Sequence, residues 1–118
     1  MTITIPGELT DLNNYIKAER SNRFAASKIK KEETEKCIWI SKNKGNVETK
    51  VKVIFTWYCK DQMKDPDNIC FAKKFILDGF VKSGLLKNDG WKQIEGFEDK
   101  FIIDKQNPRI EIELKEVS

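Results

Sequence analysis

The chain has 118 residues, of which 39% are hydrophobic and 35% charged, and its formal net charge is +3 at pH 7. This length fits one soluble domain with a core and is too short for two ordinary domains. No run approaches the ~20 apolar residues that a membrane span needs, and the start lacks the basic segment and apolar core of a secretory signal.

The sequence contains no histidine. This excludes Ser–His–Asp and Cys–His nucleophiles, histidine-ligated zinc and a histidine general base. Any chemistry must therefore use carboxylates and lysines, with or without a hard metal ion.

The three cysteines, Cys37, Cys59 and Cys70, are odd in number, far apart and set in apolar runs. This pattern favours buried thiols in a reducing compartment over a disulfide framework. We therefore expect a cytoplasmic protein.

The first half of the chain predicts one strand and two helices. Residues 2–5 alternate as a short strand that Pro6 and Gly7 end. A helix capped at residues 10–11 is expected to run to about residue 19, and residues 20–23 are expected to break it. A second helix is expected from near residue 24 to about residue 39, with an imperfect apolar stripe at Ala26, Ile29, Glu33 or Thr34, Cys37 and Trp39.

The second half predicts a long strand, then a helix, then two further strands. Residues 47–59 alternate with period two, which indicates a strand with one buried face. Residues 68–82 have helical periodicity, and residues 101–103 and 110–114 are expected to form a hairpin. The fold class expected for residues 1–118 is a single α+β domain with a mixed sheet, helices packed on it and the order β-α-α-β-α-β-β.

Basic side chains are concentrated in the first half, where 12 lysines and arginines accompany 7 acids in residues 1–60. A phosphate backbone is one partner for such a surface, and a solvated helix face is the alternative. The candidate DNA-binding residues are Lys17, Arg20, Arg23, Lys28, Lys30 and Lys31.

The segment Asp65-Pro66-Asp67-Asn68 allows two readings. In the first it is a turn in which Asp67 or Asn68 caps the following helix. In the second the two carboxylates hold a metal ion. Residues two apart in an extended loop can point the same way, so both carboxylates can bind one ion. A calcium loop is excluded, because the required glycine and glutamate positions hold Cys70 and Ile76.

Further charged residues support the metal reading. On the expected helix Asp67 and Lys74, seven apart, share one face, whereas Lys73 lies roughly 100° away. Asp89 lies beyond this helix on a turn that can fold back. Three carboxylates and one lysine suit a magnesium site, since Mg²⁺ prefers oxygen ligands and keeps waters and substrate phosphate as the others.

These motifs resemble those of the RusA-type crossover-junction endodeoxyribonucleases, often phage or prophage encoded. The resemblance extends over the whole chain, including its opening from residue 4. Its specific part is an ordered composite of Asp-X-Asp-Asn, a lysine four before an aspartate, and an acidic turn. The residues that carry it read DPDN, KKFILDGFVKSGLLKNDGW and NPRIEIEL.

The resemblance implies a homodimeric, Mg²⁺-dependent enzyme of DNA recombination and repair that resolves four-way (Holliday) junctions by paired symmetric nicks. It implies metal ligation by Asp65, Asp67 and Asp89, with Lys74 as the catalytic lysine. This chain departs from the family in carrying about one extra helical turn before the lysine, which keeps Lys73 as an alternative and as a candidate DNA contact. It also carries Asn88 where some members have a second aspartate.

A binding-only module is the competing interpretation. Phe55, Trp57 and Tyr58 fall on a strand, and aromatic strands can stack single-stranded bases. Phe55 and Trp57 share a face with the strand's valines, however, so we expect them in the core. A small structural or regulatory protein with a degenerate site is a further alternative.

Overall fold

The central strand of the fold is β2 (Val51–Cys59), in a computed structural model that describes residues 1–117. Its odd-numbered side chains are all buried and its even-numbered ones are half-buried, which confirms the predicted alternation. The strand begins at Val51 instead of Val47. The backbone before it is held by a later loop, because the Gln93 side-chain amide donates to the carbonyls of Val47 and Thr49 (3.1 and 2.7 Å).

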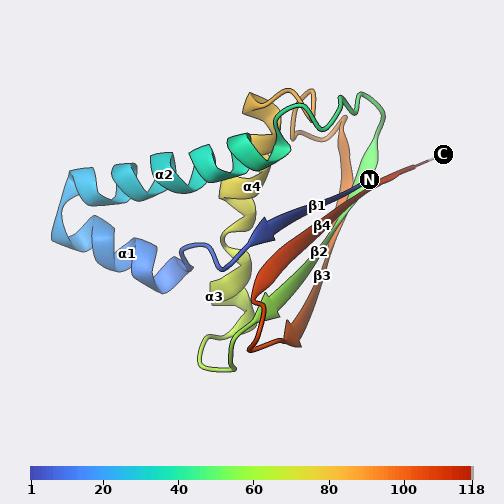
Figure 1. Cartoon of the computed structure of the whole chain (residues 1–118). Coiled ribbons are helices and arrows are strands. Elements are labelled where there is room, and N and C mark those ends of the chain that lie inside the picture. Colours follow the sequence, from blue (N-terminus) through green and yellow to red (C-terminus); the bar gives the residue numbers. More distant parts are fainter. Residues whose placement is uncertain (118) are drawn as a thin grey trace.

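Four strands form one mixed sheet in the order β1-β4-β2-β3 (Figure 1). Strand β4 (Arg109–Glu116) is antiparallel to both β1 (Thr2–Pro6) and β2. Strand β3 (Ile94–Ile103) is parallel to β2 and lies at an edge of the sheet.

The hairpin predicted for residues 101–103 and 110–114 is wrong. Strand β2 lies between β3 and β4, so Trp57 is opposite Phe101 on one side and Ile110 on the other. The connection between β3 and β4 passes the end of β2, where the Asp104 N–H donates to the Cys59 carbonyl (2.8 Å). Alternation identifies the buried face of a strand but does not identify its neighbours.

Helices α1 (Leu12–Ser21) and α2 (Arg23–Ser41) form an arm that projects from one face of the sheet (Figure 1). Asp11 caps α1 by accepting the Asn14 N–H (3.3 Å), and Asn22 caps α2 by accepting the Phe24 N–H (2.7 Å). Both predicted helices are therefore present, and Asn22 alone separates them.

The apolar stripe predicted for α2 is correct except at its end. Ala26 and Cys37 are buried, as are Glu33 and Thr34, but Trp39 is 75% exposed. Two residues of a helix turn the chain by roughly 200°, so Trp39 points away from the face that buries Cys37.

The helix predicted for residues 68–82 is divided into α3 (Pro66–Cys70) and α4 (Lys73–Lys82). A tighter turn separates them, because the Ala72 N–H donates to Ile69 and the Lys74 N–H to Phe71, each three residues back (3.3 and 3.2 Å). This turn places the Phe71 ring 5.2 Å from the ring of Tyr15 on α1.

Helix α4 lies between α2 and the sheet and provides much of the core (Figure 1). Its approach to α2 depends on Gly79, where a Cβ would collide with the Cβ of Cys37. The observed order, β1-α1-α2-β2-α3-α4-β3-β4, confirms a single α+β domain with a mixed sheet. Within residues 1–117, no helix has the length and apolar character needed to cross a membrane.

Candidate functional site

Asp65 and Asp67 lie at the start of α3, just after the loop that leaves β2, and both are exposed. Asp65 takes the N-cap position through its backbone, whose carbonyl accepts the N–H groups of Asn68 and Ile69 (3.1 Å each). In the part of the chain that the structure describes, neither carboxylate makes a hydrogen bond or an ion pair. The predicted cap by Asp67 or Asn68 is therefore wrong, because Asp65 is the N-cap, its side chain caps nothing, and Asp67 and Asn68 lie inside the first turn of α3. Within residues 1–117 the structure gives neither carboxylate a partner.

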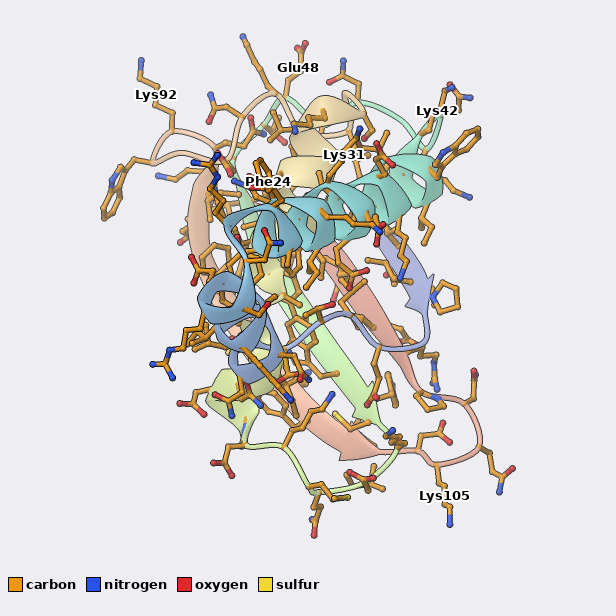
Figure 2. All side chains as sticks on the ribbon, turned by 90° about the vertical axis from the view of Figure 1, so that its left-hand side faces the viewer. Phe24, Lys31, Lys42, Glu48, Lys92 and Lys105 are labelled. Carbon is orange, nitrogen blue, oxygen red and sulfur yellow. The ribbon has the colours of Figure 1, made fainter. Side chains whose placement is uncertain are left out.

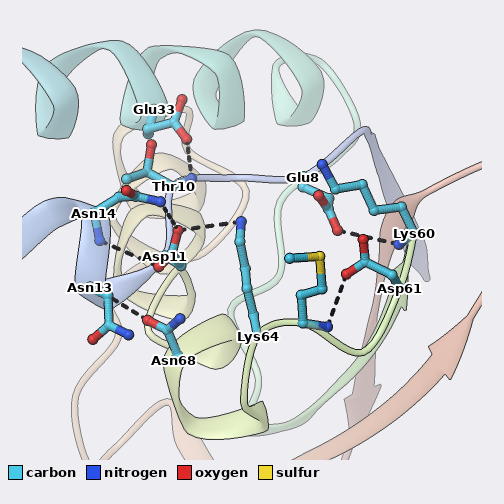
Figure 3. Close-up of polar contacts among 11 residues, drawn as sticks. Glu8, Thr10, Asp11, Asn13, Asn14, Glu33, Lys60, Asp61, Lys64 and Asn68 are labelled. Carbon is cyan, nitrogen blue, oxygen red and sulfur yellow. Dashed lines mark hydrogen bonds and ion pairs between the residues drawn. The ribbon is translucent and has the colours of Figure 1, made fainter.

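Asn68 holds this helix in place, a role that the sequence did not reveal. Its side chain is buried, and its Oδ1 accepts the backbone N–H of Asn13 at the start of α1 (2.8 Å; Figure 3). The contact joins α3 to α1 and so fixes the backbone that carries Asp65 and Asp67. The signal in the sequence was the asparagine that ends the Asp-X-Asp-Asn motif.

A second anchor precedes Asp65. The Lys64 ammonium lies 3.3 Å from the buried carboxylate of Asp11 (Figure 3). Burial raises the pKa of Asp11, but hydrogen bonds with Asn14 and Asn68 and the Lys64 charge outweigh it and lower this pKa below its ordinary value. Asp11 thus remains ionised and holds Lys64, the residue that precedes Asp65.

The two adjacent lysines of α4 have different surroundings. Lys73 is 19% exposed and pairs with Asp99 of β3 (Nζ–Oδ2 2.8 Å). Lys74 is 60% exposed and pairs with Asp78 one turn later (3.1 Å). The break at residues 71–72 invalidates the helical-wheel comparison of Lys74 with Asp67. Lys73 is paired with Asp99 in this structure, and its role as a DNA contact stays a prediction.

Asp89 lies at the opposite end of the helices from Asp65 and Asp67. The segment from Asp67 to Lys82 spans roughly 20 Å at ~1.5 Å per helical residue, and the loop from α4 to β3 lies at the end of α4 that is away from α3 (Figure 1). Within residues 1–117, no three His, Cys, Asp or Glu side chains lie together as a metal site would require. Asn88 stabilises the turn, because its Oδ1 accepts the Gly90 N–H (2.9 Å).

The predicted basic stretch lies on the α1–α2 arm, and all six of its side chains are exposed. Figure 2 labels one of them, Lys31 on α2. Lys28 approaches Glu32 at 3.9 Å. Among the described residues the other five have no ion-pair partner. The arm thus presents cations to solvent at a distance from the sheet.

The aromatic residues of β2 belong to the hydrophobic core and do not form a surface on which nucleobases could stack. Phe55 and Trp57 are buried and their rings stack on each other, with centroids 5.4 Å apart, which confirms their expected place. The Trp57 indole N–H donates to Asp99 (2.9 Å).

The edge strand β3 carries an exposed apolar surface. Phe97, Phe101 and Ile103 lie on the helix-bearing side of the sheet, on its edge strand, and each is more than a third exposed. Trp91 on the preceding turn is almost fully exposed. Exposed apolar residues on an unpaired edge strand are typical of an interaction surface.

The cysteines offer no reactive nucleophile. Burial, together with the nearby Glu33, raises the pKa of Cys37 to about 12. Cys37 and Cys59 are buried free thiols, as predicted, and Cys70 is half-buried.

No protein-family model matches this chain, and no curated protein sequence matches it significantly.

Proposed function

We propose that this protein is a Mg²⁺-dependent endodeoxyribonuclease of the RusA type that resolves four-way DNA junctions by paired symmetric nicks. The observation that carries the proposal is the pair of exposed carboxylates, Asp65 and Asp67, which have no partner within residues 1–117 and sit on a backbone held by Asn68 and Lys64. The composite motif that contains them supports the same function.

The donor chemistry of this pair fits a hard cation. Aspartate oxygens are the ligands that Mg²⁺ prefers, and the absence of histidine disfavours a softer metal. Bound there, the ion would polarise the scissile phosphate and lower the pKa of a bound water. Lys74, exposed and held one turn from Asp78, would stabilise the negative charge that develops on the phosphate.

Asp89 enters such a site through a second copy of the chain. In a two-fold dimer each copy presents the same surface to the other, so one end of a helix can meet the opposite end of its partner's helix. That arrangement would bring Asp89 of one copy to Asp65 and Asp67 of the other. The exposed apolar surface of β3 borders the turn that carries Asp89 and is a suitable contact for the dimer.

The arm supplies the DNA contacts in this proposal. Its six exposed cations would meet phosphates without regard to sequence, and two arms in a dimer would grip two helices of a junction. The three free cysteines fit a protein of the reducing cytoplasm.

The proposal is tested by incubating the protein with a labelled four-way junction and a linear duplex, each with Mg²⁺ or with EDTA. We expect paired nicks in the junction only when Mg²⁺ is present, and none with Asp67→Asn, a change that keeps the side chain's shape. Junction binding without nicking at any metal concentration would favour the binding-only alternative. Failure to bind DNA would contradict both.

A further inference from the structure

We propose that Phe24, together with Arg23, is a stacking element that contacts exposed base faces at the centre of branched DNA. This inference rests on the proposed function and deepens it, because it assigns the feature by which the arm distinguishes a branch point from a duplex. Phe24 is not part of the motif or of the basic set.

Phe24 occupies the outermost corner of the molecule. It lies where α1 turns into α2, at the end of the arm farthest from the sheet, and Figure 2 shows it on the side facing the viewer. Its side chain is 66% exposed, although phenylalanine is usually buried. An apolar ring at the tip of a projecting arm has no role in the core of this fold.

Hydrogen bonds hold the backbone of this corner. Asn22 is the only residue between the two helices, and its side chain accepts the backbone N–H of Phe24 (2.7 Å). The Ala25 N–H donates to the Asn22 carbonyl (3.1 Å). The ring is therefore presented from a fixed backbone, which lowers the entropic cost of stacking on a partner.

The charge around the ring identifies the class of partner. Residues 17–31 contain Glu19 as their one acid, against six basic residues. The Arg23 guanidinium lies 4.8 Å from the centroid of the Phe24 ring, and Lys28 follows on the same helical face. A planar apolar group surrounded by cations matches a nucleobase on an anionic backbone.

Branched DNA has accessible base faces, which a continuous duplex lacks. In a continuous duplex both faces of each base pair are covered by neighbouring pairs, so a ring can stack only by unstacking a step, which costs a few kcal/mol. At a branch point base pairs end, and a face can be reached at little cost. Phe24 should therefore contribute to junction binding and very little to duplex binding.

The chain offers a matched control at the other end of α2. Trp39 is 75% exposed and has Lys42 over its ring at 5.2 Å, but it lies outside the basic stretch. We would measure binding of wild type, Phe24→Ala, Phe24→Trp and Trp39→Ala in EDTA. The probes are a junction with 2-aminopurine beside the branch point and a duplex of the same sequence.

We expect Phe24→Ala to weaken junction binding about tenfold, in the range for loss of one stacked base, and to change duplex binding less than twofold. Phe24→Trp should restore junction binding and the change in 2-aminopurine fluorescence, and Trp39→Ala should behave as wild type. Junction binding by Phe24→Ala within twofold of wild type, or equal loss on both DNAs, would overturn the inference while leaving the nuclease proposal standing. A wild-type protein that binds neither DNA would overturn both.

Discussion

The ammonium of Lys73 lies 2.8 Å from the Asp99 carboxylate and joins α4 to the edge strand β3. The same ammonium lies 5.0 Å from the centroid of the Phe55 ring and 4.6 Å from that of Phe97. Asp99 also accepts the Trp57 indole N–H. Lys73 is thus surrounded by partners that hold it against the sheet, whereas its neighbour Lys74 points to solvent.

The first prediction concerns stability. Replacing Lys73 with Ala leaves the half-buried Asp99 carboxylate without its cation, so we expect a loss of about 1–3 kcal/mol in the free energy of unfolding. The matched change Lys74→Ala removes only an exposed pair and should cost less than about 1 kcal/mol. Urea unfolding measures both, and equal losses would contradict the different surroundings described for the two lysines.

The second prediction ranks the same lysines in catalysis. Lys74→Ala should lower the single-turnover cutting rate by about two to three orders of magnitude, the effect of removing one group that stabilises transition-state charge. Lys73→Ala should lower it less than tenfold, and the Mg²⁺ dependence should persist in both. The reverse ranking would mean that Lys73 leaves Asp99 when DNA binds and acts on the phosphate.

The third prediction is a pH dependence at Asp11. Its pKa in the folded chain is lowered from the ordinary value of 3.8, so its ionised form stabilises the fold. This contribution is complete above the unfolded pKa and is lost as the pH falls through the lower, folded pKa. Asp11→Asn keeps an oxygen that can cap α1 but removes the charge that attracts Lys64.

We therefore expect wild type to be more stable than Asp11→Asn near pH 7 and the difference to shrink below about pH 4. Glu98 and Asp104, whose pKa values are also lowered, titrate in both proteins, so the difference between the two unfolding curves isolates Asp11. A difference that stays constant from pH 7 to pH 3 would show that the Asp11 charge has no part in the anchor.

The fourth prediction separates affinity from chemistry on the arm. Replacing Lys28, Lys30 and Lys31 with Gln should weaken DNA binding and reduce the salt dependence by roughly one unit of slope per lost phosphate contact. The cutting rate of the bound junction should change little. An unchanged slope would identify these lysines as an ordinary solvated helix face.

Local patterns predicted the elements of this fold better than their arrangement. The alternation of β2, the cap at Asp11 and the break between the first two helices depend on neighbouring residues, so the sequence predicted them. The capping role of Asn22 was not predicted. Whether β3 pairs with β4 or with β2 depends on contacts between distant segments, so the hairpin prediction failed. The break before Lys73 could not be predicted either, because no Gly or Pro marks it. The Phe71 ring at the break packs against Tyr15, which lies in a distant segment of the chain.

Some features of the candidate site could likewise be predicted from the sequence, and others could not. Asp65 and Asp67 follow a strand and open a helix, so their exposed position was predictable. The anchors Asn68 and Lys64 were not, since their partners Asn13 and Asp11 lie more than 50 residues away in the chain. The distance between Asp67 and Asp89 follows from helix length, and it is the reason for proposing a site that two copies share.

The central claim is a metal site shared by two copies of the chain, and the most direct test is to mix two variants, Asp67→Asn and Asp89→Asn, each expected to be inactive. Nicking of a four-way junction is then assayed with Mg²⁺. If each metal site takes Asp67 from one copy and Asp89 from the other, mixed dimers contain one site with both changes and one intact site. Nicking of one strand should then return, though each variant alone is inactive. A mixture that remains inactive after verified subunit exchange, or an Asp89→Asn variant that cuts as wild type, would contradict the shared site.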